Sequence, residues 1–133
     1  MTQELFGASW TAKLEELAGA LRAVHKSLID STRRDYEKVH GRINGPYALF
    51  SLVAHDPAFA WLQPMTRLIV EIEEVQGRKS PAIEGADLMR ARRAVGELLV
   101  SGPGDFGSAF QARVQADPDV AVEHGRLHAL LRE

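Results

Sequence analysis

One long apolar stripe at helical spacing constrains the fold more than any other feature of the sequence. It recurs at intervals of three and four residues and consists of Trp10, Leu14, Leu17, Leu21, Val24 and Leu28. Residues at this spacing share one face of an α-helix. The stripe then drifts as far as Val39, because a straight helix of period 3.6 outruns a heptad spacing. We predict one helix from an N-cap at Ser9 to about His40, ended by Gly41.

Proline and glycine divide the rest of the chain into shorter helical segments. A helix from Pro46 to about Ala54 is expected, with Leu49, Phe50 and Val53 buried. Further helices are predicted over about 64–75, 83–100, 106–114 and from 118 to the terminus. The sequence lacks runs in which β-branched residues alternate with polar ones, so strands are not expected.

Pro64 stands between two apolar runs, 57–62 and 65–75. Inside a helix it would remove a backbone hydrogen bond and clash with the preceding turn, at a cost of about 3 kcal/mol. We therefore predict a short helix that begins after the N-cap Asp56 and ends near Leu62, with Gln63 as a corner before a core helix. The pair Asp117-Pro118 repeats the arrangement of Asp56-Pro57, an N-cap followed by proline.

Length and composition favour a single globular domain. The chain has 133 residues, of which 45% are hydrophobic and 26% charged, enough for a hydrophobic core without disulfides. We predict an all-α, single-domain bundle over residues 1–133, with about four main helices, short extra helices and a long N-terminal helix.

Charge and targeting signals narrow the possible partners. The formal net charge of -2 disfavours general binding to nucleic acid. The uncharged stretch 57–66 is about half the ~20 residues that a membrane-spanning helix needs. The first residues lack the pattern of a secretory signal. We therefore expect a cytoplasmic protein that does not enter the membrane.

Two pairs of side chains are candidates for a metal site. Glu37 and His40 form an E-x-x-H pair, the spacing that di-iron carboxylate bundles place on one helix face. Glu71 and Glu74 are candidates to complete the site, as are His124 and His128. The sequence contains no second E-x-x-H, so solvated side chains at helix ends are the competing interpretation. No cofactor is expected.

A cluster of large side chains near the Gln63-Pro64 corner is a candidate ligand pocket. Its residues are Tyr36, Phe59, Trp61 and Met65. Large apolar side chains with few polar groups are typical of small-molecule pockets, but beside a helix corner they more often form core.

The motifs that carry common catalytic chemistry are missing from the sequence. No serine lies in a glycine elbow, and neither a phosphate-binding loop nor a dinucleotide fingerprint occurs. The glycines of 102–107 are interpreted as a helix break. His25 lies among apolar neighbours and is expected to be a hydrogen-bonded core residue. Arg33-Arg34 and the arginines at 90, 92 and 93 are interpreted as solvated faces, because acidic residues lie near them.

Two segments, VHKSLIDSTRRDYEKVHG and FAWLQPMTRLIVEIEE, resemble those of a family of small uncharacterised bacterial helical proteins. That family carries an F-x-W-L-x-P-[LM]-[ST]-x-L-I-V-x-I segment after an L-H-K-x-L-I segment. The resemblance covers about the first 75 residues. It implies a bacterial, cytoplasmic protein and no particular reaction.

These observations predict a protein-binding or assembly module without catalytic activity, most readily a homodimer, since a long helix with a sustained stripe invites pairing with a second helix. A protein partner of another kind stays open. The alternatives are a metal-binding helical bundle at Glu37, His40, Glu71 and Glu74, or a small-ligand-binding protein with a pocket near Trp61.

Overall fold

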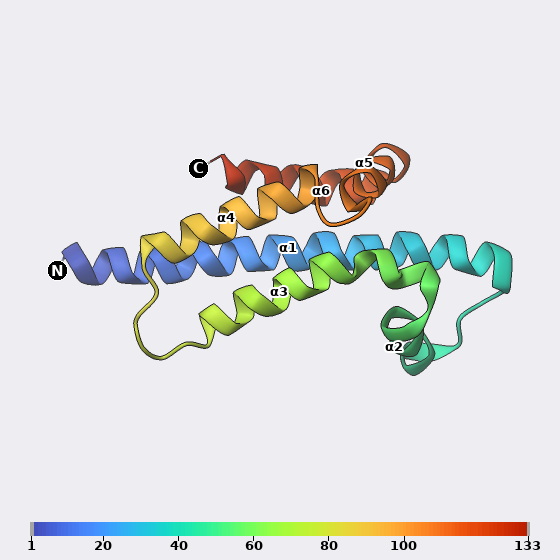
Figure 1. The fold of residues 1–133 in the computed structure, drawn as a ribbon, viewed down its shortest axis with the longest axis horizontal. Coiled ribbons are helices and arrows are strands. Elements are labelled where there is room, and N and C mark those ends of the chain that lie inside the picture. Colours follow the sequence, from blue (N-terminus) through green and yellow to red (C-terminus); the bar gives the residue numbers. More distant parts are fainter. Residues whose placement is uncertain (1, 133) are drawn as a thin grey trace.

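The structure is a computed structural model that describes the backbone of residues 2–132 and the side chains of residues 10–132. Figure 1 shows a bundle of helices without strands in this range, which confirms the all-α fold. Its elements are α1 (Thr2–His40), α2 (Gly45–His55), the 3-10 helix η1 (Pro57–Leu62), α3 (Gln63–Gln76), α4 (Gly85–Val100), α5 (Phe106–Ala116) and α6 (Pro118–Leu131).

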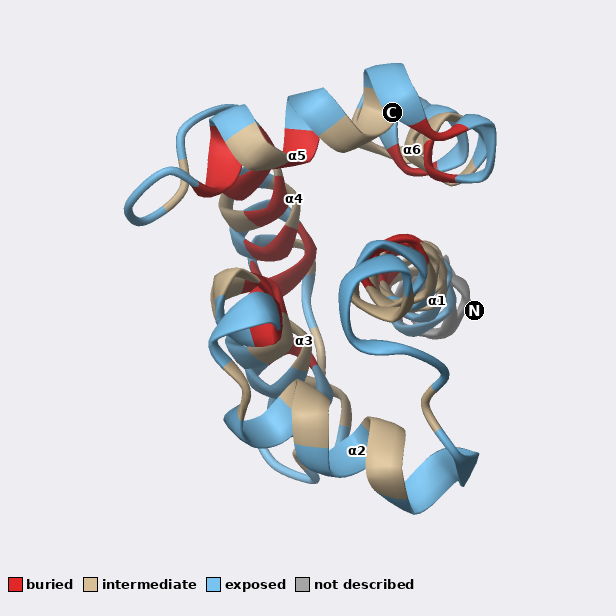
Figure 2. Cartoon of the chain, turned by 90° about the vertical axis from the view of Figure 1, so that its right-hand side faces the viewer, coloured by how far each residue is buried: buried red, intermediate tan, exposed pale blue. Residues whose placement is uncertain are grey.

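Helix α1 is the spine on which the other helices pack. It contacts η1, α3, α4 and α6, and α6 is its most extensive neighbour. Figure 1 shows α3 and α4 as an antiparallel pair joined by the loop at 77–84, with α2 near the C-terminal end of α1. Viewed end-on in Figure 2, α3 and α4 form one side of the bundle, with buried residues toward α1, and α5 runs across the top between α4 and α6.

The stripe of α1 forms the centre of the core, as predicted. Leu14, Leu17, Leu21, Val24 and Leu28 are almost fully buried. Gly41 follows the helix with a φ of +87°, a conformation that favours glycine, and its N–H closes the last turn on the Glu37 carbonyl.

The predicted start of this helix was wrong. Helix α1 begins at Thr2, so Ser9 lies within it and is not its N-cap; serine is tolerated inside helices. The side chain of Ser9 lies outside the described side chains. Val39 is 78% exposed because α1 runs past the helices that cover its stripe (Figure 1).

The proline corner follows the prediction with one difference. Asp56 caps η1 by accepting a hydrogen bond from the Ala58 N–H at 2.8 Å, and η1 ends at Leu62. Gln63 is already helical, so η1 passes directly into α3 and no separate corner residue exists. Pro64 occupies the first turn of α3, where its missing N–H costs no helical hydrogen bond. The buried face of α3 contains Met65, Leu68 and Ile72.

The second half of the chain contributes α4, α5 and α6. Helix α4 begins at Gly85 rather than 83, because the Glu84 N–H donates to Asp87 Oδ2 at 2.9 Å and closes the first turn there. Its predicted inward residues are all buried, namely Leu88, Ala91, Val95, Leu98 and Leu99. A Cβ added to Gly107 would lie 2.3 Å from the Val100 carbonyl oxygen, so glycine allows α5 to approach the end of α4. Asp117 caps α6 as expected, accepting from the Asp119 N–H at 3.0 Å.

Candidate functional site

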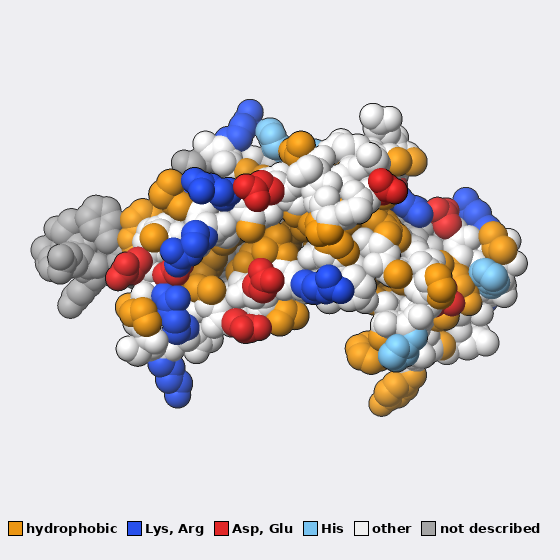
Figure 3. Space-filling view, in the orientation of Figure 1, with side chains coloured by type: hydrophobic (Ala, Val, Ile, Leu, Met, Phe, Trp, Pro, Cys, Tyr) orange, Lys and Arg blue, Asp and Glu red, His pale blue; other side chains and the backbone are white. Residues whose placement is uncertain are grey.

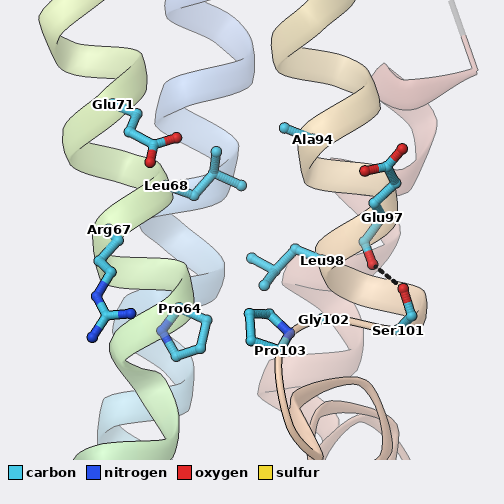
Figure 4. A pocket seen from close by; sticks show the side chains of 10 residues that line it. All are labelled: Pro64, Arg67, Leu68, Glu71, Ala94, Glu97, Leu98, Ser101, Gly102 and Pro103. Atoms are coloured by element: carbon cyan, nitrogen blue, oxygen red, sulfur yellow. Dashed lines mark hydrogen bonds between the residues drawn. The ribbon is translucent and has the colours of Figure 1, made fainter.

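A groove of about 400 Å³ lies between α3 and α4 (Figure 4). Both helices contact α1 as well as each other. Figure 4 shows Pro64 and Pro103 facing each other at one end, with Leu68 and Leu98 pointing into the space between the helices. Figure 3 shows the same hollow with an apolar floor and charged side chains along its rims.

A second hollow of about 230 Å³ continues the groove toward the loop at 77–84. It shares Leu68, Glu71 and Ala94 with the first hollow and reaches Leu14 of α1 at its floor. Asp87 and Arg90 line its far end.

Asp87 is a buried acid held by cations. It accepts hydrogen bonds from Arg78 at 2.7 Å and Arg90 at 2.5 Å, as well as from the Glu84 N–H. The hydrogen bond from Arg78, helped by the Glu84 N–H and opposed by burial, lowers the pKa of Asp87 to about 2. A carboxylate with so low a pKa is a poor proton acceptor, so its role is to join the loop to α4.

The lining of the groove contains a single hydroxyl group. It is that of Ser101, which donates to the Glu97 carbonyl at 3.1 Å, and no histidine lines either hollow. A serine nucleophile needs a neighbouring base.

The predicted aromatic pocket is divided between the core and the surface. Tyr36 and Phe59 are in contact, with ring centroids 5.9 Å apart. Phe59 and Met65 have no exposed surface. Trp61 turns to another face of η1 and contacts Phe106, with centroids 5.6 Å apart. None of the predicted four residues lines the hollows between α3 and α4.

The four candidate metal ligands do not come together. The Glu37 carboxylate accepts the Ile43 N–H at 2.8 Å, and the His40 ring lies 4.4 Å from that of Tyr36. Glu71 and Glu74 lie toward the other end of the antiparallel pair of α1 and α3 (Figure 1). Over the described side chains, no group of three or more histidine or acidic residues is placed to hold a metal ion.

The histidines flagged in the sequence have structural surroundings. His25 Nε2 lies 2.9 Å from Thr66 Oγ1, which itself donates to the Leu62 carbonyl, and burial lowers the pKa of His25. The predicted hydrogen bond of His25 is confirmed, but the side chain is only partly buried, at the edge of the core. The ring of His124 lies edge-on to Phe110 and 5.9 Å from that of His128. Burial, followed by the charge of His128, lowers the pKa of His124.

The predicted burial of Phe50 on α2 was wrong. None of the residues of α2 is buried, and Tyr47 and Phe50 are 91% and 73% exposed. Leu49 and Val53 are only partly buried against the core. The cause is tertiary: α2 packs mainly on η1, so only one side of the helix is covered. Figure 3 shows hydrophobic side chains projecting from the lower right of the surface, where α2 lies.

Within residues 2–132, no helix combines the length and the apolarity that a bilayer crossing requires. No family model matches the chain, and comparison with curated proteins and with solved structures finds no match. The resemblance to a family of small bacterial proteins therefore stays a prediction, and the candidate sites rest on their own geometry.

Proposed function

We propose that this protein is a non-catalytic assembly module that pairs with a second copy of its own chain through α2. The observation that carries the proposal is a stripe of exposed, uncharged side chains along this helix, which we name the α2 stripe. It consists of Tyr47, Phe50, Ser51 and Ala54. Their spacing of three, four and seven residues places them on one helix face.

The order of sizes along the stripe favours a second copy as the partner. Two large aromatic residues come first and two small residues follow. When two such helices pack antiparallel, Tyr47 lies opposite Ala54 of the other copy, and Phe50 lies opposite Ser51. Large side chains then fill the spaces above small ones, as close packing between helices requires. A two-fold interface needs this kind of self-complementary surface.

The charge of α2 supports the same partner. The helix contains no lysine, arginine, aspartate or glutamate, and its only basic side chain is that of His55. An uncharged surface meets no like-charge repulsion when it packs on itself, and charged residues are depleted at interface cores. Val39, near the end of α1, is a further exposed apolar residue, 78% accessible.

Elsewhere in the protein, side chains of the types that act in catalysis are engaged in structural contacts, which supports a binding role. His25 is hydrogen-bonded to Thr66, Asp87 is held by two arginines, and the Ser101 hydroxyl donates to a main-chain carbonyl.

Sedimentation equilibrium tests the proposal. Wild-type protein is expected to shift from the chain mass of 14.7 kDa toward twice that mass as its concentration rises. Phe50→Glu places a charge in the α2 stripe and is expected to keep the protein monomeric. Met89→Glu is the matched control, since Met89 is an exposed apolar residue of α4, 64% accessible.

Two outcomes contradict the proposal. If wild-type protein stays monomeric up to millimolar concentration, self-association is excluded. A different protein is then the remaining candidate partner. A dimer that Phe50→Glu and Met89→Glu weaken equally places the interface elsewhere.

A further inference from the structure

A polar cleft of about 570 Å³ lies where α1 turns into α2, apart from the groove between α3 and α4. Its walls come from the last turns of α1, the connection at 41–44 and the first turn of α2. The charged residues among them are Arg33, Glu37 and Arg42, and the others are Ile43, Gly45, Pro46 and Leu49. A volume of this size falls within the range of small-molecule sites.

The two arginines of the cleft lack partners, unlike many other arginines of the chain. Arg34, Arg78 and Arg113 each bind a carboxylate. Over the described residues, neither Arg33 nor Arg42 forms a hydrogen bond or an ion pair, and Arg33 Nε is buried without a partner. A buried donor without an acceptor is unfavourable and uncommon in folded proteins.

The carboxylate in the cleft does not neutralise this pair. Glu37 Oε2 accepts the Ile43 N–H at 2.8 Å and thereby holds the connection between the helices. It forms no ion pair with Arg33 or Arg42 in the described structure. Two guanidinium groups therefore face one carboxylate that already has a partner, and the cleft has an excess of positive charge.

The start of α2 adds further donors on the same side. Asn44 occupies the N-cap position, but its side chain accepts no hydrogen bond from the helix. The first N–H groups of a helix have no partner within the helix and attract anions. Ile43, Pro46 and Leu49 supply an apolar wall beside them.

We propose that this cleft binds the oxyanion group of a small molecule, a phosphate or a carboxylate, between Arg33 and Arg42. Guanidinium groups bind both kinds of oxyanion with paired hydrogen bonds. The apolar wall contacts the rest of the ligand. This site is independent of the α2 stripe, which consists of different side chains.

Calorimetric titrations with inorganic phosphate and, separately, with acetate test the site and distinguish the two ligand classes. Arg33→Gln and Arg42→Gln are each expected to weaken binding of the preferred anion by at least about tenfold, because each removes a charged donor. Arg93→Gln, on an exposed position of α4, is the matched control and is expected to bind like wild type. Binding should also weaken as the concentration of sodium chloride rises.

An NMR titration locates the anion. Phosphate is expected to shift the amide signals of Gly45, Tyr47 and Ala48 in wild type, and not in a folded Arg42→Gln variant. Arg42 is exposed, so its substitution leaves the core intact. The proposal is overturned if neither anion binds, or if both cleft variants bind as well as wild type. Loss of binding in Arg93→Gln to the same degree would show a diffuse surface effect instead. Calorimetry measures anion binding in the cleft, and sedimentation measures self-association through the α2 stripe. One proposal can therefore fail without the other.

Discussion

Arg113 on α5 binds Asp35 on α1, with 2.6 Å between the guanidinium Nη1 and the carboxylate Oδ2. The same nitrogen donates to the buried Ser31 hydroxyl at 3.0 Å. The guanidinium also lies 5.8 Å from the ring centroid of Trp61 on η1. A single side chain therefore joins three elements that are far apart in the sequence.

Removal of this side chain should destabilise the fold. Arg113→Ala is expected to lower the free energy of unfolding by about 1–2 kcal/mol, from the lost hydrogen bonds and the lost contact with Trp61. Arg126→Ala is the control, since Arg126 forms an exposed ion pair with Glu123 on the same helix. It should cost less than about 0.5 kcal/mol. Urea unfolding followed by tryptophan fluorescence gives both values, and equal losses would contradict the bridging role of Arg113.

Phe59 and Phe50 differ in burial, and substitutions at the two positions should differ in their effect on stability. Phe59 has no exposed area, whereas Phe50 is 73% exposed. Phe59→Ala is expected to lower the free energy of unfolding by about 3–5 kcal/mol, because it leaves a cavity in the core beside Tyr36. Phe50→Ala should change it by less than about 0.5 kcal/mol in dilute monomeric protein. Should Phe59→Ala prove as mild as Phe50→Ala, Phe59 would be better explained as part of an adaptable pocket than as core.

The ion pairs of Asp87 predict a loss of stability in acid. Folding lowers the pKa of this carboxyl from 3.8 to about 2, so the unfolded chain takes up the proton first as the pH falls. The stability that Asp87 supplies is complete above pH 3.8 and is lost toward pH 2.

Asp87→Asn tests this directly. At pH 6 the variant should be less stable than wild type by about 1–3 kcal/mol, and the difference should shrink toward pH 2. Asp105→Asn, an exposed position before α5, serves as the control. A difference that stays constant from pH 6 to pH 2.5 would argue against the ionised form as the source of stability.

His25 predicts a second pH dependence, with its window at higher pH. Burial lowers its pKa below 6.5 in the folded state, so the unfolded chain binds the proton at higher pH than the folded one. Stability is therefore complete above pH 6.5 and decreases as the pH falls through 6.5 toward the lowered value. His25→Gln should reduce the slope of the free energy of unfolding against pH in this window. His124 has a pKa lowered in the same sense, so some slope should persist.

The comparison for His25 is His55→Gln, since His55 is exposed at the end of α2. Between pH 5 and pH 7, the free energy of unfolding of His55→Gln should depend on pH as that of wild type does. If His25→Gln also leaves the curve unchanged, proton uptake at His25 does not oppose folding, and its burial has no energetic effect in this range.

Local patterns predicted the helices well because their causes are local. Spacing of three and four residues gave the buried faces of α1, α3 and α4. The Asp-Pro pairs correctly marked the starts of η1 and α6. The errors at Ser9 and at residue 83 concern helix starts, where a good capping residue can also lie inside a helix.

The candidate sites were harder to predict because they depend on contacts between distant segments. Arg34 was expected to have acidic neighbours on its own helix, but it binds Asp117, the residue that caps α6. The Arg33 and Arg42 cleft forms only when the chain turns between α1 and α2. A pair of basic residues that are nine positions apart, flanking the Gly41 helix end, was the only available signal.

Sequence periodicity alone was therefore enough to establish an all-α chain built on one long helix, since each helix face follows from the spacing of its own residues. Tertiary packing determined which apolar faces are covered. Phe50 and Phe59 are chemically identical and both lie in apolar runs, yet one projects into solvent and the other lies in the core. The difference arises because η1 packs directly on α1, whereas α2 packs mainly on η1 and leaves its outer face exposed.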